Sequence, residues 1–388
     1  MKKILIVNNN LHIGGVQKAL VDLLKEIHDQ YDITLALFYP HGKLLEQVPQ
    51  DVKILPVRSA YRYLGMSRYD VEGKPFLKLR RGIYAAISRV FGRSFAISLM
   101  ALGQKKLCGF DAAISYLHDS GDKVFYGGCN EFVLRHTHGA KKIAFLHCDY
   151  SMCGANTKKN AARYEKFDKI AACSQGCADT FVENLPDFSK KTIVVPNAHD
   201  YNNIWRSVSK ETVSLPEGRV NILTVARFGK EKGVGRAIEA LTQISCVFKN
   251  FHYYVIGDGI LRPQVEQAIL NGDLQERVTL LGEMENPYGY MKAADLLLIP
   301  SVSEAAPLVI GEAACLGTPV LSTKTSSAVE MIEQTGFGWV CENDINALTD
   351  ALEILLKDPS LLAEQKKKLQ ELRVDNQTAV ARFAALIG

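Results

Sequence analysis

Short apolar runs alternate with longer segments of helical periodicity along most of the chain. The first run, residues 3–7, predicts a buried strand, and apolar residues between Val16 and Ile27 then recur at helical spacing. Further strands are predicted at residues 33–38, 52–56, 111–117, 142–146, 169–174, 192–197, 220–226, 253–256, 278–281, 296–299, 320–321 and 339–340. Because strands and helices alternate regularly, we expect an α/β fold with doubly wound parallel sheets.

A polar stretch interrupts this pattern near the middle of the chain. Residues 200–219 are largely polar and end with the turn-forming sequence Pro216-Glu217-Gly218, so we expect an interdomain linker there. A chain of 388 residues is long enough for two domains with separate cores. We therefore predict a first domain at residues 1–205 and a second at residues 206–375.

Composition adds only a few exclusions. The hydrophobic share of 47% and the charged share of 23% are ordinary for a globular protein, and a net charge of +4 singles out no partner. The nine cysteines have no disulfide framework, and neither Cys148/Cys153 nor Cys173/Cys177 has zinc-finger spacing, so we expect reduced thiols. We also expect no secretory signal and no membrane span, because every apolar run is too short.

Two glutamates follow the predicted strand at residues 296–299. A short helix is predicted from Leu308 to Leu316, with Gly317 suited to its C-terminal stop. Glu304 then falls in the strand-to-helix loop, and Glu312 lies about one turn into the helix. Ligands of doubly wound sheets bind at this edge of the sheet. Carboxylates repel phosphate, so these two favour the hydroxyls of a sugar.

Two cations follow the first strand of the second domain. Arg227 and Lys232 lie five positions apart on one loop. A guanidinium can bind phosphate oxygens bidentately and an ammonium supplies a point charge, so the pair suits a diphosphate leaving group. Solvated surface charges are the alternative interpretation.

The loops of the first domain carry further candidates. Gly14 and Gly15 follow the first strand and would allow a ligand to approach the backbone, although a plain tight turn is the alternative. Their spacing is not the Gly-x-Gly-x-x-Gly of dinucleotide-binding folds. His118 and His147 each stand where a strand gives way to a loop, and Asp149 follows His147 closely. Either histidine could instead be a structural group satisfied by the fold.

The spacing Glu304-x7-Glu312, followed by Gly317-x-Pro319-Val320, resembles the donor-site motif of family 4 glycosyltransferases. Arg227 and Lys232 resemble the cation pair of the family sequence Gly-Arg-x4-Lys-Gly, with Ala226 replacing the first glycine. The resemblance implies a GT-B fold, in which two Rossmann-like domains face each other across a cleft. It also implies that a C-terminal helix at residues 376–388 packs back on the first, acceptor-binding domain, and that the second domain binds the donor.

The resemblance further implies a retaining transferase that moves a hexose from a nucleotide sugar, probably a UDP-sugar, to a glycan or lipid-linked acceptor in cell-surface polysaccharide synthesis. The implied catalytic residues are Glu304, His118, Arg227 and Lys232. The implied donor-binding residues are Gly14, Gly15, Arg227, Lys232, Glu304, Leu308, Val309 and Glu312, and His147 and Asp149 are assigned to the acceptor. Since the chain has no Asp-x-Asp motif, we expect neither a metal nor a cofactor. The sequence Ala305-Ala306-Pro307 departs from the family's Gly-Phe-Gly or Gly-Phe-Pro, so the donor sugar stays open.

Residues 58–106 form a distinctly basic segment. They contain eleven lysines and arginines against only Asp70 and Glu72, interleaved with aromatic residues, whereas the rest of the chain is net acidic. Apolar residues between Leu79 and Phe91 recur at helical spacing. We predict that this segment contacts an anionic membrane surface, so that a cytoplasmic protein attaches peripherally to the inner face of the cell membrane. A solvated domain surface is the alternative.

Two other functions compete with a transferase. A UDP-sugar 2-epimerase of related fold would require a set of carboxylates and histidines for proton abstraction, which we cannot place. An inactive nucleotide-sugar-binding subunit would not require the four charged residues Arg227, Lys232, Glu304 and Glu312 to be intact.

Overall fold

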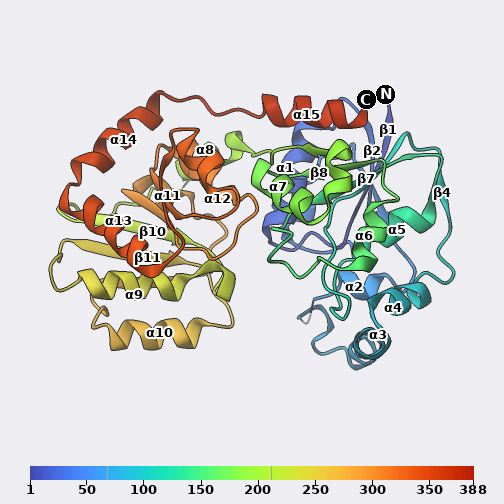
Figure 1. Cartoon of the computed structure of the whole chain (residues 1–388), viewed down its shortest axis with the longest axis horizontal. Helices are drawn as coiled ribbons and strands as arrows, with labels where there is room; N and C mark the ends of the chain where they lie inside the picture. The colour runs from blue at the N-terminus through green and yellow to red at the C-terminus, as the bar shows by residue number, and fades with distance from the viewer. Residues whose placement is uncertain (68, 211) are drawn as a thin grey trace. The chain divides into compact units, whose positions relative to one another are not determined.

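The computed structural model describes residues 1–67, 69–210 and 212–388, which divide into two compact units. Unit 1 comprises Met1–Ala198 and Asn376–Gly388, and unit 2 comprises His199–Asp375. Each unit is built around one parallel sheet flanked by helices (Figure 1). The predicted α/β class and the doubly wound parallel sheets are confirmed.

Unit 1 contains a seven-stranded parallel sheet of order β3-β2-β1-β5-β7-β8-β9. Its strands are β1 Lys3–Asn8, β2 Asp32–Leu37, β3 Lys53–Pro56, β5 Ala112–Ser115, β7 Lys141–Leu146, β8 Lys169–Ala172 and β9 Thr192–Val194, and β4 Leu107–Cys108 pairs separately with β6 Thr137–His138. Its helices are α1 Gly15–Ile27, α2 Arg62–Gly65, α3 Pro75–Phe91, α4 Arg93–Met100, α5 Cys129–His136, α6 Lys158–Tyr164, α7 Gln175–Asn184 and α15 Gln377–Ile387, with short 3-10 turns η1 Lys43–Gln47, η2 Tyr69–Val71 and η3 Pro186–Lys191.

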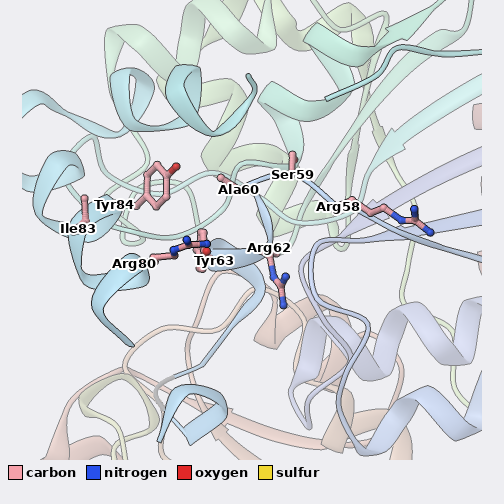
Figure 2. A pocket seen from close by; sticks show the side chains of 8 residues that line it. All are labelled: Arg58, Ser59, Ala60, Arg62, Tyr63, Arg80, Ile83 and Tyr84. Carbon is pink, nitrogen blue, oxygen red and sulfur yellow. The ribbon is translucent and has the colours of Figure 1, made fainter. Parts of the chain in front are cut away.

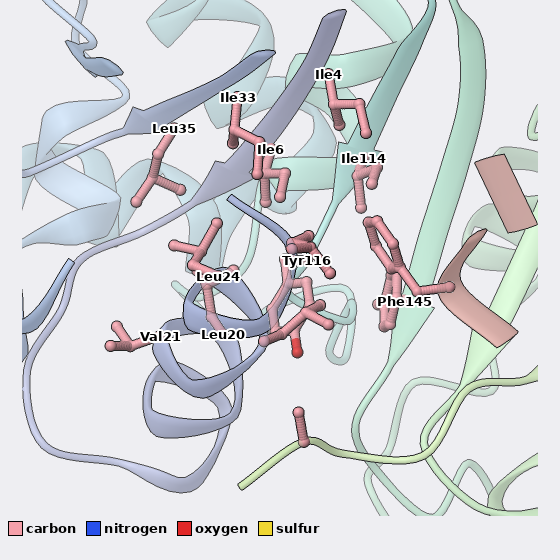
Figure 3. Close-up of a cluster of buried hydrophobic side chains, with 14 of the residues drawn as sticks. Ile4, Ile6, Leu20, Val21, Leu24, Ile33, Leu35, Ile114, Tyr116 and Phe145 are labelled. Atoms are coloured by element: carbon pink, nitrogen blue, oxygen red, sulfur yellow. The ribbon is translucent and has the colours of Figure 1, made fainter. Parts of the chain in front are cut away.

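One face of this sheet packs on α1. Ile4 and Ile6 of β1 lie against Leu20 and Leu24 of α1 in a fully buried cluster (Figure 3). Alternate residues of a strand point to one face, and α1 presents its apolar stripe to them. The cluster also contains residues of α15, including Phe383, whose ring meets Tyr31 edge to face at 5.9 Å between centroids. The C-terminal helix is therefore part of the unit 1 core.

Unit 2 contains a six-stranded parallel sheet of order β12-β11-β10-β13-β14-β15. Its strands are β10 Val220–Val225, β11 Phe251–Ile256, β12 Val278–Gly282, β13 Leu296–Ile299, β14 Val320–Thr323 and β15 Gly338–Cys341. Its helices are α8 Tyr201–Lys210, α9 Val234–Ile244, α10 Arg262–Asn271, α11 Tyr288–Ala293, α12 Leu308–Leu316, α13 Ile345–Lys357 and α14 Ser360–Glu371, with the 3-10 turn η4 Lys230–Lys232 and the π-helical turn η5 Val329–Glu333.

Both faces of the unit 2 sheet are buried. Along β10, Ile222 belongs to the cluster formed with α9, α10 and α13, whereas its neighbour Leu223 belongs to the cluster formed with α8, α11 and α12. Leu296 and Leu297 of β13 divide in the same way. Strands covered on both faces need apolar residues at successive positions, which explains why these strands read as continuous apolar runs in the sequence.

The interdomain linker expected at residues 200–219 is largely wrong. Residues Tyr201–Lys210 form α8, which buries Ile204 and Val208 in unit 2, one helical turn apart. Its remaining positions are mostly polar and at least partly exposed, so the segment reads as polar although it is helical. The two units divide between Ala198 and His199, whereas the division predicted after residue 205 would cut this helix. Residue 211, within the expected linker, lies outside the described residues.

The basic segment 58–106 is mainly helical. The helix expected from the periodicity between Leu79 and Phe91 is confirmed by α3, which ends at Gly92. Gly92 has a φ of 86°, a conformation that favours glycine, and α4 starts directly after it. Among the described residues, no helix is long and apolar enough to cross a membrane.

Candidate active site

In unit 2, the order of the strands creates a crevice beside β10. The chain leaves β10 towards β11 on one side and leaves β13 towards β14 on the other. The loops that follow β10 and β13 therefore diverge, and ligands of such sheets bind between them at the carboxyl ends of the strands. Lys232 lies on the first loop and Glu304 on the second, as the sequence predicted.

The structure joins these two residues in an ion pair. Lys232 Nζ lies 2.7 Å from Glu304 Oε1, and Ser301 Oγ donates to the same oxygen at 2.8 Å. Ser326 Oγ donates to the Glu304 carbonyl at 2.8 Å, which fixes the loop backbone. The side chains remain 23% and 11% exposed, so both can be reached by a ligand.

The two loops are also tied together through their backbones. Val302 N donates to Glu231 O at 2.8 Å. Gly233, which caps the N-terminus of α9, has a φ of 65°, and a Cβ at this position would collide with the Pro300 carbonyl oxygen. Only glycine fits this close approach, so Gly233 sets the separation of the loops that carry Lys232 and Glu304.

Arg227 lies on the same loop as Lys232 but does not join the ion pair. Its side chain is 77% exposed and its Nη2 lies 3.2 Å from Glu231 Oε1. An exposed pair of this kind contributes little to stability, about 0–1 kcal/mol, so the guanidinium can exchange this partner for a ligand. The nearby sequence Ile256-Gly257-Asp258-Gly259 forms a tight turn, in which Gly257 and Gly259 pack closely on the backbone of Ala226 and Phe228.

The helix that carries Glu312 has the predicted bounds. It runs from Leu308 to Leu316, and Gly317 ends it with a φ of 75°. Glu312 is 4% exposed, and the Tyr288 hydroxyl donates to its Oε1 at 3.5 Å. Leu308 is buried, and Val309 is half-buried against the apolar cluster of α8, α11 and α12. Glu312 is thus an oriented carboxylate beneath the start of α12.

Unit 1 has an equivalent switch between β1 and β5. Gly14 and Gly15 follow β1, and Gly14 has a φ of −177°, an extended conformation open to any residue. A Cβ at Gly14 would meet only the Gln17 side chain, and one at Gly15 would meet nothing within 4 Å. Neither the backbone conformation nor internal packing requires these glycines, which favours close approach of a ligand over a plain tight turn.

The two predicted histidines stand at the carboxyl ends of the neighbouring strands β5 and β7. Burial lowers the pKa of His118 to about 4, against the opposing charge of Asp119. Burial and then the charge of His118 lower the pKa of His147 to about 3. Within the described ranges, His118 Nδ1 and His147 Nε2 are buried and have no hydrogen-bond partner. The structure therefore holds two neutral imidazoles, each with one ring nitrogen left unsatisfied.

Asp149, assigned with His147 to the acceptor, has a clear local role. Its Oδ1 accepts a hydrogen bond from Ser151 N at 3.0 Å, and its carbonyl accepts from Met152 N and Cys153 N. It therefore stabilises the turn after β7, and its contact with an acceptor stays a prediction.

Sequence reasoning missed a buried charge cluster directly behind His118. Arg93 Nη1 lies 2.8 Å from Asp119 Oδ1, and Arg93 Nη2 lies 3.0 Å from Glu131 Oε1. Arg163 completes the cluster with distances of 3.1 Å to Asp119 and 3.0 Å to Glu131. Burial and then repulsion from Asp119 raise the pKa of Glu131, whereas Arg93 and Arg163 outweigh burial and lower the pKa of Asp119.

This cluster corrects one sequence-based assignment. Arg93 was counted among the basic residues of the membrane-contacting segment, but its side chain is only 1% exposed. It pairs with acids 26 and 38 positions further along the chain, which a local pattern cannot reveal. The only available signal was Asp119 itself, an acid next to a candidate site histidine.

The described part of the chain contains no group of three or more His, Cys, Asp or Glu side chains that could hold a metal ion. All nine cysteines are free thiols. The expectation that catalysis needs no metal stays a prediction.

Comparisons with known proteins agree with this architecture. Residues 206–372 match the family model described as glycosyl transferases group 1. Over 394 aligned residues, 99% of this chain and 98% of the relative, the chain is 30% identical to the N-acetylgalactosamine-N,N'-diacetylbacillosaminyl-diphospho-undecaprenol 4-alpha-N-acetylgalactosaminyltransferase of Campylobacter jejuni. It is 33% identical to the putative colanic acid biosynthesis glycosyltransferase WcaL of Escherichia coli, over 42% of this chain and 43% of the relative.

Solved structures show the same fold. HepE of Anabaena in complex with UDP-glucose aligns with a TM-score of 0.69 at 19% identity, covering 100% of this chain and 98% of HepE. WaaG, a glycosyltransferase involved in lipopolysaccharide biosynthesis, aligns with a TM-score of 0.63 at 16% identity, covering 98% of this chain and 99% of WaaG. The near-complete match to the Campylobacter relative decides the family: the chain belongs to the group 1 glycosyltransferases and has their GT-B fold.

Proposed function

We propose that the protein is a retaining hexosyltransferase that moves a sugar from a UDP-sugar to a glycan or lipid-linked acceptor in cell-surface polysaccharide synthesis. The observation that carries the proposal is the Lys232–Glu304 pair at the switch point of unit 2, where a cation and a carboxylate lie 2.7 Å apart. A nucleotide sugar presents a diphosphate next to a ring of hydroxyls, so it can satisfy both partners at once. HepE, of the same fold, is described in complex with UDP-glucose.

Lys232 and Arg227 are assigned to the diphosphate. Negative charge grows on this group as the sugar departs, and fixed cations stabilise that charge. Glu304 would exchange Lys232 for hydroxyls of the transferred sugar, and the buried carboxylate of Glu312 would accept from the ribose hydroxyls. Hydrogen bonds that involve a charged group contribute about 1.5–3 kcal/mol each.

The retaining mechanism follows from what the carboxylates do. Glu304 is held by Lys232 and Ser301, and we assign no side chain as a covalent nucleophile. The acceptor would attack from the face that the diphosphate leaves, and a leaving phosphate oxygen would take the acceptor proton. His118, neutral at physiological pH, would orient a sugar hydroxyl by hydrogen bonding without acting as a charged group.

The experiment that tests this proposal is a ligand screen followed by a turnover assay. Thermal stability of unit 2 would be recorded with UDP, GDP, UDP-glucose, UDP-galactose and their N-acetylated forms. A ligand at 100 times its Kd adds about 2.7 kcal/mol of stability, so a UDP-sugar should raise Tm clearly. The same donor without acceptor should release free UDP slowly.

The alternatives give different products. An epimerase would convert the UDP-sugar into its 2-epimer without net release of UDP unless the intermediate escapes, and an inactive subunit would bind without turnover. Preference for GDP-sugars, or inversion of the anomeric centre in the product, would contradict the proposal.

We further propose that unit 1 attaches to the inner face of the membrane through α3. The helix leaves several large apolar side chains in solvent, among them Phe76 at 76%, Val90 at 71% and Phe91 at 66% exposure. Lys78 and Arg89 on the same helix are exposed as well. Cations near an anionic leaflet contribute about 1 kcal/mol each, and apolar residues that enter the headgroup region add to this.

Vesicle co-sedimentation tests the attachment. The protein should sediment with phosphatidylglycerol vesicles at low salt and be released as salt rises, because exposed charges are screened. Lys78→Gln/Arg89→Gln should weaken binding. The matched control is Lys249→Gln/Lys357→Gln, which removes the same charge from exposed positions of unit 2. Equal loss in both double variants would mean that only net charge matters and would contradict attachment through α3.

A further inference from the structure

A second basic feature of unit 1 is a pocket between α2 and α3. It has a volume of about 420 Å³ and is lined by residues from three segments (Figure 2). The lining residues are Arg58, Ser59, Ala60, Arg62, Tyr63, Arg80, Ile83 and Tyr84. They come from the loop after β3, from α2 and from the middle of α3, all within unit 1.

The charge of this pocket is uncompensated. Three of its eight lining residues are arginines and none is acidic. Within the described ranges, Arg58, Arg62 and Arg80 form no ion pair with a carboxylate, and all three are exposed. The neighbouring acid Asp70 is already held by His12 at 2.9 Å and by Ser67 N at 2.7 Å.

The next arginine on α3 makes an instructive contrast. Arg81 Nε donates to the Met66 carbonyl at 3.0 Å, and its guanidinium lies 5.4 Å from the centre of the Phe125 ring. Arg81 is thus used by the fold. Arg80, one position away, has no such contact in the described structure, and Figure 2 shows its side chain extending towards Tyr63.

The floor of the pocket is rigid and offers further donors. The rings of Tyr63 and Tyr84 stack at 5.4 Å between centroids and 26° between planes, and Tyr63 is only 6% exposed. Ser59 Oγ is buried and has no hydrogen-bond partner among the described residues. In Figure 2 the side chains of Arg58 and Arg62 extend outward at the rim. Exposed side chains change rotamer within nanoseconds, so both guanidiniums can turn towards a ligand.

The pocket opens next to the apolar stripe of α3. Ile83 lines the pocket and is 50% exposed, and Leu79, one turn earlier, is 62% exposed. Residues i and i+4 lie on one face of a helix. A ligand whose anionic group occupies the pocket could therefore extend an apolar chain along Leu79 and Phe76.

We infer that this pocket binds the diphosphate of an isoprenoid-linked acceptor, with the isoprenoid chain lying along the exposed stripe of α3. Guanidiniums bind phosphate oxygens bidentately, and three of them suit a group with more than one negative charge. A volume of 420 Å³ equals about fourteen water molecules at about 30 Å³ each, more than a single phosphate requires. The inference rests on the proposed function, since it names the class of acceptor.

Calorimetry with a short-chain analogue tests the pocket without a membrane. Farnesyl diphosphate would be titrated into the full chain below its micellar concentration, alongside farnesyl monophosphate and inorganic pyrophosphate. We expect farnesyl diphosphate to bind and both comparison ligands to bind at least about tenfold more weakly, because each lacks one of the two recognised parts. Pyrophosphate binding as tightly would point to a free phosphate ligand, and monophosphate binding as tightly would remove the diphosphate; either overturns the inference.

Variants separate the pocket from general charge. Arg80→Gln should weaken farnesyl diphosphate binding at least about tenfold, the lower end for a charged hydrogen bond. Arg58→Gln/Arg62→Gln should weaken it further. Arg89→Gln is the control, exposed on the same helix but outside the pocket, and should stay within about twofold. An equal loss in Arg89→Gln, or displacement of the probe by excess UDP, overturns the inference.

The same titrations distinguish this inference from the proposed function. UDP affinity measures the donor site of unit 2 and should be unchanged in every pocket variant, which also shows that the variants are folded. If the wild-type chain binds farnesyl diphosphate in the pocket but no UDP-sugar, the proposed transfer reaction fails while the pocket stands.

Discussion

In both units a crevice lies where the strand order reverses, beside β1 and β5 in unit 1 and beside β10 and β13 in unit 2. The side chains at the two positions differ in kind. Unit 2 places charges at the mouth of the crevice, with Lys232 and Glu304 partly exposed. Unit 1 places two neutral histidines there and keeps its charges behind them, where Arg93 and Asp119 are 1% and 0% exposed. One topology thus serves two kinds of recognition.

The difference also separates two uses of ion pairs. A partly exposed pair contributes little to folding and can be exchanged for a ligand. A buried pair contributes through geometry, and breaking it leaves an unpaired charge in the interior. Charges in unit 2 should therefore matter for binding, and those of the unit 1 cluster for stability.

The largest expected effect comes from breaking the buried cluster. Arg93→Met should destabilise unit 1 by about 3–5 kcal/mol, because Asp119 and Glu131 would keep only Arg163. Both tryptophans, Trp205 and Trp339, lie in unit 2, so hydrogen exchange at β5 would report on unit 1 and fluorescence on unit 2.

Arg89→Met is the control for this substitution, since Arg89 is exposed on the neighbouring helix. It should change stability by less than about 0.5 kcal/mol. Equal destabilisation by the two substitutions would show that the cluster does not hold unit 1 together.

The next effect concerns the exposed pair of unit 2. Lys232→Ala should lower turnover at least ~100-fold, about 2.7 kcal/mol, because the diphosphate loses its cation, and Arg227→Ala should act similarly. Unfolding followed by tryptophan fluorescence should change little. Lys230→Ala, on the same loop, is the matched control. Near-normal transfer by both Lys232→Ala and Arg227→Ala would remove the diphosphate assignment.

A smaller effect should appear on lowering the pH. The folded pKa values of His118 and His147, about 4 and about 3, lie below the ordinary value near 6.5. Between pH 6.5 and 4 the unfolded chain therefore binds more protons, and stability falls as the pH falls. From pH 6.5 to 5 each imidazole accounts for about 2 kcal/mol.

Urea unfolding at pH 5 and pH 7.5 measures this dependence. His118→Asn should reduce the difference between the two midpoints for unit 1. An unchanged difference would mean that His118 is not held neutral by burial. The transfer rate should show no inflexion near pH 6.5, since neither imidazole titrates there in the folded state.

The smallest expected effect distinguishes the two glutamates. Glu312→Ala should weaken UDP and UDP-sugar binding alike by about tenfold, as expected for a lost charged hydrogen bond. Glu304→Ala should leave UDP binding nearly unchanged and reduce transfer, because it is assigned to the sugar. Calorimetry with UDP on both variants decides, and equal losses would merge the two roles.

Local patterns were sufficient where structure is locally determined. The strand β13, the bounds of α12 and its stop at Gly317 were all predicted, because a buried run, an apolar helix and a left-handed glycine each leave a signal within a few residues. The same pattern placed Lys232 and Glu304 on the two loops of one crevice. Their direct contact could not be predicted, since the residues are 72 positions apart and meet only through the strand order.

The failures have a common physical origin. α8 was taken as a linker because only Ile204 and Val208 are fully buried, and two apolar residues in ten leave a weak periodicity. Arg93 was taken as a surface residue because arginines are seldom buried unless paired. Its partners Asp119, Glu131 and Arg163 come from separate segments, so its burial is a tertiary property.

The place of α15 in the core of unit 1 has a consequence for synthesis on the ribosome. Ala379, Phe383, Leu386 and Ile387 complete a cluster that otherwise consists of residues from the first 198 positions. These four residues are translated after all of unit 2, at about 5–20 residues per second. The nascent unit 1 therefore waits some ten seconds or more with part of its apolar core uncovered, whereas unit 2 can complete its own core as soon as its last helix emerges. A chaperone that binds exposed apolar surface should accordingly recognise unit 1 of the growing chain in preference to unit 2.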